Sequence, residues 1–110
     1  MEIYFDGDNK LFSWEAESKG YRSDIYVKID KELFRVSAYD LARITQDFND
    51  EISHNGFYRI DANLILLKEV TKDEIISTIT RLYLEDFFGE LKPLALDEGN
   101  VMSLNLIKIN

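Results

Sequence analysis

Residues 25–36 read IYVKIDKELFRV, and apolar side chains alternate with polar ones on both sides of a short turn. A turn at Asp30-Lys31 gives two strands whose apolar residues all lie on one face. Because a shift by one residue would turn every apolar side chain to the opposite face, this pattern predicts one register. The predicted pairs are Ile25 with Val36, Tyr26 with Arg35, and Val27 with Phe34.

Two helices are predicted downstream of this hairpin. Ser37 to Asp40 resembles a capping box with Asp in place of Glu, so a helix should span about 38–55 and stop at Gly56. Its apolar residues recur every three or four positions, which is typical of a helix that packs on a core. Thr71 to Glu74 is a full capping box and predicts a second helix over about 72–88, ended by Gly89 and Pro93. The apolar stripe of the first helix consists of Leu41, Ile44, Phe48 and Ile52.

The remaining strands are predicted at the two ends and between the helices. A turn over residues 6–9 would pair Ile3 with Phe12 in an N-terminal hairpin. Residues 63–70 read as a largely buried strand, and residues 103–110 as a last strand. Strands gathered at one end with helices inserted later indicate a single α+β domain over residues 1–110. We therefore expect a mainly antiparallel sheet of about five to seven strands with two helices packed on it.

Composition restricts the function. The chain has 110 residues, of which 45% are hydrophobic, enough for one real core, and its net charge is −8. Such a charge repels phosphate backbones and attracts basic partners, so we expect no nucleic-acid binding. Solubility alone is the alternative explanation of the charge. Without cysteine, a signal peptide pattern or an apolar run of membrane-spanning length, the expected location is the cytoplasm and no membrane contact is expected.

The stretch TQDFNDEISHNGF, residues 45–57, is the strongest candidate for chemistry. Glu51 and His54 form an E-x-x-H pair, but di-iron sites need two such motifs and two further glutamates on four helices. Catalytic carboxylate pairs need environments that separate their pKa values, which a solvated helix flank does not provide. A serine nucleophile would have to use His54 without any supporting motif. The sequence therefore predicts no enzyme, no metal and no cofactor.

An acidic helix flank is the feature that remains. On a helical projection Asp40, Asp47, Glu51 and His54 lie on one flank, with Asp50 beside them, opposite the apolar stripe. Such a flank is either a plain solvated surface or a surface that meets a basic partner. Aromatic residues without an assigned core position favour an interface, because tyrosine is a frequent anchor of interfaces. These aromatic residues are Tyr21, Tyr26, Tyr39, Phe57 and Tyr58.

Residues 25–93 resemble immunity proteins of bacterial polymorphic-toxin systems, and contact-dependent growth inhibition systems above all. The similarity consists of the order of elements, the Tyr39-Asp40-Leu41 start of the first helix, and the Gly56-Phe57-Tyr58 step before the next strand. The resemblance implies a small cytoplasmic protein that binds a cognate toxin domain, often a basic nuclease, and blocks it.

The predicted toxin-binding residues combine the flank with one tyrosine. Two other classes stay open: an acidic scaffold or oligomerisation module, and a non-catalytic domain that binds a small molecule between sheet and helices. The oligomeric state is left open by the sequence. The predicted contact residues are Asp40, Asp47, Asp50, Glu51 and Tyr58.

Overall fold

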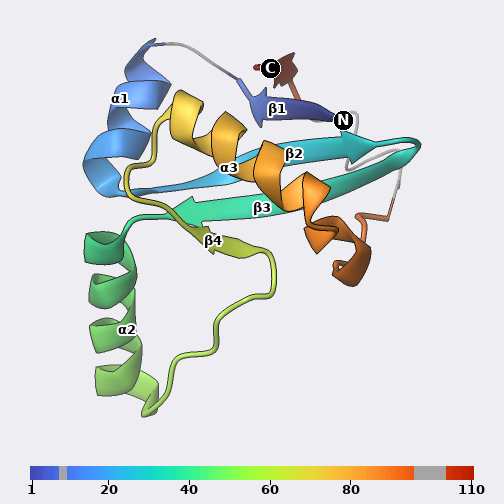
Figure 1. Ribbon diagram of the computed structural model, residues 1–110. Helices are drawn as coiled ribbons and strands as arrows, with labels where there is room; N and C mark the ends of the chain where they lie inside the picture. The colour runs from blue at the N-terminus through green and yellow to red at the C-terminus, as the bar shows by residue number, and fades with distance from the viewer. Residues whose placement is uncertain (8–9, 96–103) are drawn as a thin grey trace.

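The computed structural model describes residues 1–7, 10–95 and 104–110, which form an α+β domain around one mixed sheet (Figure 1). Its five strands follow the order β4-β3-β2-β1-β5, and every neighbouring pair is antiparallel except β3 and β4. Three α-helices and one short 3-10 helix are described, where the sequence predicts two helices. The elements are β1 Glu2–Asp6, α1 Lys10–Lys19, β2 Tyr21–Ile29, β3 Glu32–Tyr39, α2 Leu41–Asn55, β4 Leu64–Leu66, α3 Lys72–Leu84, η1 Phe87–Glu90 and β5 Leu106–Lys108.

The β2–β3 hairpin has the predicted register. Ile25 pairs with Val36, Tyr26 with Arg35, and Val27 with Phe34. The register shifts once, between Arg22 and Ile25, and a bulge there turns Arg22 toward the face that the core occupies. The alternation of apolar and polar residues therefore predicts the strand register at the centre of the sheet correctly.

The predicted N-terminal hairpin is wrong, because residues 10–19 form helix α1 instead of a strand. Ile3 pairs with Val27 of β2, not with Phe12, and the other edge of β1 pairs with β5. The segment KLFSWEAESK is rich in Leu, Glu, Ala and Lys, which are strong helix formers. The side chains of Phe12 and Trp14 stay exposed. Residues 8–9 of the predicted turn lie outside the described residues.

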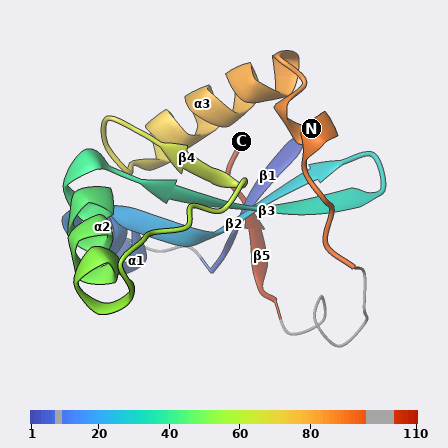
Figure 2. The same ribbon diagram turned by 90° about the horizontal axis from the view of Figure 1, so that it is seen from below.

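The core lies between one face of the sheet and α3, which runs along that face (Figure 2). Ile75 and Ile79 of α3 are fully buried there, and Phe88 of η1 closes the end near the β2–β3 turn. Thr71 caps α3 as predicted, because its Oγ1 accepts a hydrogen bond from the backbone N–H of Glu74 at 3.3 Å. The sheet contributes Ile3, Phe5, Ile25, Val27, Phe34, Val36, Ala38 and Ile65.

The later strands are shorter than predicted. Only Leu64–Leu66 of the predicted strand 63–70 pairs with β3, and this pairing is parallel. Leu67 and Val70 are still buried, because the chain passes over the core on its way to α3. Of the predicted strand 103–110, β5 covers Leu106–Lys108, and residue 103 lies outside the described residues.

Within the described residues, no helix is long and apolar enough to cross a membrane.

Candidate functional site

Helix α2 projects from the end of the sheet at which β3 finishes (Figure 1). Its ends are well capped. The Asp40 side chain accepts a hydrogen bond from the backbone N–H of Arg43 at 2.8 Å, and Gly56, with φ of 81°, donates to the carbonyl of Ile52 at 3.1 Å. These caps stabilise the helix without any contribution from a core.

Three of the four residues of the apolar stripe of α2 face solvent, and Ile44 is half-buried. All residues of α2 are described, and none of them is buried. Leu41 is 68% exposed, Phe48 49% and Ile52 40%. The prediction that this stripe packs on the sheet is therefore wrong. The helical period shows that two faces of a helix differ, but not which of the two meets the body of the protein.

The side of α2 that faces the body is polar. Arg43, Ile44, Asp47 and Glu51 are the half-buried positions of the helix. The Arg43 guanidinium carbon lies 4.3 Å from the centroid of the Tyr21 ring, and its Nε donates to Asp47 Oδ1 at 3.1 Å. The cation–π contact holds α2 against the aromatic end of the sheet, and the ion pair within the helix ties Asp47 to the same arginine.

Two tyrosines border this polar contact. Burial raises the pKa of Tyr39, and the charge of Asp47 raises it further. The same two causes, in the same order, raise the pKa of Tyr58, to which Glu51 also contributes. The Tyr39 ring lies beside the ring of Tyr21, with 5.7 Å between centroids. Both phenols are therefore kept neutral, close to the carboxylates.

The predicted contact residues have largely structural surroundings. Asp40 is a helix cap and Asp47 an ion-pair partner, while Glu51 accepts a hydrogen bond from Asn55 Nδ2 at 2.7 Å. Asp50 alone among the four acids is in the exposed class. The structure brings Asp47, Glu51 and Tyr58 together, as the predicted site requires, but on the side of α2 that faces the body.

The sequence does not predict the exposed apolar surface of α2. We call Leu41, Phe48 and Ile52 the α2 ridge. These residues belong to the apolar stripe, which predicts a core position because amphipathic helices usually bury their apolar side. With Asp47 and Glu51 turned toward the body, the ridge is the largest departure of α2 from an ordinary solvated helix.

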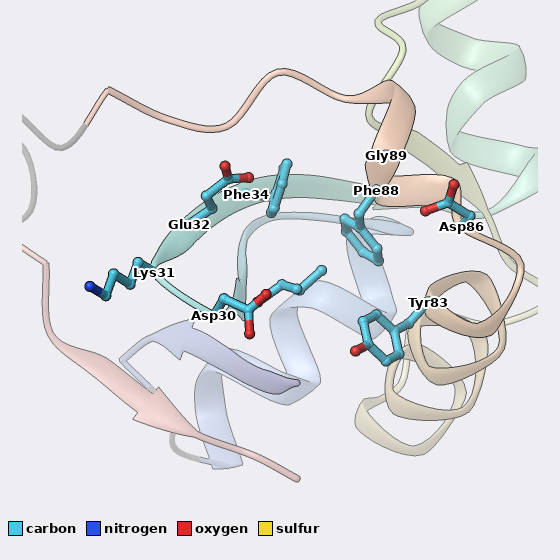
Figure 3. A pocket seen from close by; sticks show the side chains of 9 residues that line it. Asp30, Lys31, Glu32, Phe34, Tyr83, Asp86, Phe88 and Gly89 are labelled. Carbon is cyan, nitrogen blue, oxygen red and sulfur yellow. The ribbon is translucent and has the colours of Figure 1, made fainter.

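A cavity of about 450 Å³ opens between the β2–β3 turn and the α3–η1 segment (Figure 3). Its walls are aromatic and its rim is charged. Phe34 and Phe88 are buried at its base with 5.4 Å between ring centroids, and Tyr83 stands at the opening. The lining residues are Ile29, Asp30, Lys31, Glu32, Phe34, Tyr83, Asp86, Phe88 and Gly89.

Comparison with known proteins gives no relative: no family model, curated protein or solved structure matches the chain. The function therefore has to be inferred from the geometry of α2 and of the cavity, together with the sequence resemblance.

Proposed function

We propose that the chain is an immunity protein that binds and neutralises a cognate bacterial toxin domain, with the α2 ridge at the centre of the contact. One observation supports this proposal above the others. A helix capped at both ends projects from the domain, contributes nothing buried and exposes Leu41, Phe48 and Ile52. Exposed apolar patches of this kind mark sites at which a protein docks on another one.

The ridge has the geometry of a helix that enters an apolar groove. Such helices are recognised through anchors spaced by three, four and seven residues, and Leu41, Phe48 and Ile52 lie seven and four residues apart on one side. Burial of apolar area contributes roughly 25 cal/mol per Å² to association, from which the costs of lost motion, side-chain ordering and polar desolvation are subtracted. Because α2 is already ordered by its caps, little conformational entropy is lost on docking.

Charge selects the kind of partner. The chain carries a net charge of −8, so a second copy is repelled while a basic surface is attracted. Asp50 is exposed on α2 and can meet a basic rim around the groove. The proposed partner is therefore a basic protein domain with an apolar groove. A nuclease domain fits this description, because its surface must attract phosphate backbones.

The test is co-expression with the toxic C-terminal domain encoded by a neighbouring gene. Wild type should restore growth and co-purify with the toxin domain. The double variant Leu41→Ser/Phe48→Ser should lose at least about 30-fold in affinity, since truncation of a single hot-spot residue already costs about 2 kcal/mol or more. Asp50→Asn should slow association and reduce its dependence on salt.

A matched control lies on α1, where Leu11 and Trp14 are also well exposed. Leu11→Ser/Trp14→Ser removes a comparable apolar surface and should leave protection intact. Failure of wild type to protect would overturn the immunity function. Full protection by the α2 double variant would overturn the role of the ridge and leave the immunity function standing.

A further inference from the structure

In the described part of the chain, two arginine guanidinium groups each pack on an aromatic ring and each form an ion pair with a carboxylate. The Arg22 guanidinium carbon lies 3.5 Å from the centroid of the Phe5 ring, and its Nε donates to Asp24 at 2.7 Å. Arg43 combines Tyr21 with Asp47 in the same way. Ring and carboxylate together compensate for the water that a cation loses.

The cavity behind the β2–β3 turn also combines aromatic rings with carboxylates. Phe34 and Phe88 form its base, and Tyr83 and Asp30 lie on opposite sides of its opening (Figure 3). Asp30, Glu32 and Asp86 supply three carboxylates to the lining. Within the described part of the chain, none of these carboxylates has an ion-pair partner.

No cationic side chain of the lining lies between the rings and the carboxylates of the cavity. Lys31 is the one cationic residue among the described lining residues, and it extends away from the rings (Figure 3). The volume of about 450 Å³ is at the lower end of the range of small-ligand pockets. It therefore has room for a cationic head and a short alkyl stem.

The backbone holds two of the carboxylates at defined places. Asp30 and Asp86 both have left-handed backbone conformations, with φ of 54° and 59°. A Cβ on Gly89 would lie 2.7 Å from the Asp86 carboxylate, so that side chain sits directly against the glycine backbone. Such positions are uncommon for residues other than glycine and are found most often for Asn and Asp.

We infer that this cavity binds an organic cation with an apolar stem, a guanidinium or alkylammonium group, between the aromatic base and the rim carboxylates. The stem would cover Phe34 and Phe88, and the cationic head would lie between Tyr83 and Asp30. This site is separate from the α2 ridge and does not depend on the immunity function.

The test compares two probes of nearly the same shape, n-butylguanidinium and the neutral n-butylurea, by titration into 15N-labelled protein. The cation should cause saturable shifts of the backbone amides of the lining residues and bind at least about threefold more tightly than the urea. Asp30→Asn and Tyr83→Leu should each weaken the binding of n-butylguanidinium by a similar factor. Asp50→Asn, an exposed acid on α2, should not.

Equal binding of the two probes, or shifts that do not saturate, would overturn the inference. Both cavity variants change exposed side chains, and their unchanged spectra outside the cavity would show that they fold. The N-acetylated tripeptide amide Gly-Arg-Gly, whose only charge is the guanidinium, identifies the source of the cation. Tighter binding of this peptide than of n-butylguanidinium supports a side chain of a partner protein, and weaker or equal binding supports a free small molecule.

Discussion

At the scale of single residues, Gly20 and Asp40 form the joint from which α1, β2 and α2 diverge. Gly20 has φ of 74°, and a Cβ built on it would lie 2.5 Å from Oδ1 of Asp40. The backbone N–H of Asp40 donates to the Gly20 carbonyl at 2.8 Å, while its side chain caps α2. One glycine thus positions the cap of the helix that carries the proposed contact surface.

We expect Gly20→Ala to destabilise the protein by more than Gly56→Ala. Both positions have positive φ, which costs an L-residue about 1–2 kcal/mol, but Gly56 has nothing within 4 Å of its Cβ position. The clash with Asp40 should add about 0.5–2 kcal/mol, the usual value of a lost N-cap. Urea denaturation of both variants measures the difference. Equal losses would show that Asp40 moves aside freely.

The ion pair of Arg22 should matter for stability where an exposed pair does not. Arg22 is 6% exposed, with Asp24 at 2.7 Å. Removal of the charge by Asp24→Asn should cost about 1.5–3 kcal/mol, the range for hydrogen bonds to charged groups. Glu85→Gln breaks the exposed pair with Arg81 and should cost under about 1 kcal/mol. Chemical denaturation at two salt concentrations compares them, and similar losses would contradict the expectation.

Tyr39 should make stability depend on alkaline pH. Burial, followed by the charge of Asp47, raises its pKa above 10.0, so the fold favours the neutral phenol. This contribution is fully present below the unfolded pKa and is lost as pH rises through the folded pKa. Wild type should therefore lose stability relative to Tyr39→Phe above about pH 10. Urea midpoints between about pH 8 and 11 measure this; parallel curves would contradict it.

At the scale of elements, the sequence was informative wherever a pattern depends on neighbours in the chain. The register of β2–β3, the Thr71 cap and the Gly56 stop all follow from local rules and are confirmed. The N-terminal hairpin failed because apolar residues at 1, 3, 12 and 14 fit an alternating pairing by chance. The helix-forming composition of residues 10–19 was the stronger signal.

The orientation of α2 could not be obtained from the sequence. Its end at Gly56 is confirmed, but its predicted start at about 38 is wrong, because β3 runs to Tyr39 and Asp40 is the N-cap. The face that meets the body is decided by the distant ring of Tyr21, against which Arg43 packs. The wrong orientation of α2 also made the predicted exposure of the candidate site wrong. The sequence places Asp47 and Glu51 outward and the apolar ridge inward, and the structure reverses both, while Asp50 stays exposed.

This reversal changes what mutations in α2 and α3 should do. Ile79 of α3 is fully buried, so Ile79→Ala should cost about 2–5 kcal/mol. Phe48 is half exposed on α2, and Phe48→Ala should stay under about 1 kcal/mol. Urea melts of the two variants distinguish the orientations. A loss above about 2 kcal/mol for Phe48→Ala would mean that the ridge is part of a core after all.

At the scale of the whole molecule, the net charge opposes self-association through the α2 ridge. Two copies with charge −8 repel each other at low ionic strength, and salt screens this repulsion within about 10 Å at 0.1 M. We expect a monomer in dilute buffer and growing self-association as salt rises, weakened by Leu41→Ser/Phe48→Ser. Sedimentation at several salt and protein concentrations tests this. A dimer at low salt that the variant abolishes would make a second copy the occupant of the ridge.

The sheet order also has a consequence for how the protein is made. β1 lies between β2 and β5, so the strand nearest the start of the chain pairs with the strand nearest its end. Asn110 Oδ1 accepts from the backbone N–H of Ile3 at 2.8 Å, which adds a contact across almost the entire chain. Pairing over such a separation folds slowly, and it can form only after residues 106–110 have left the ribosome. The edge of β1 that pairs with β5 is therefore open to wrong partners until residues 106–108 have been synthesised.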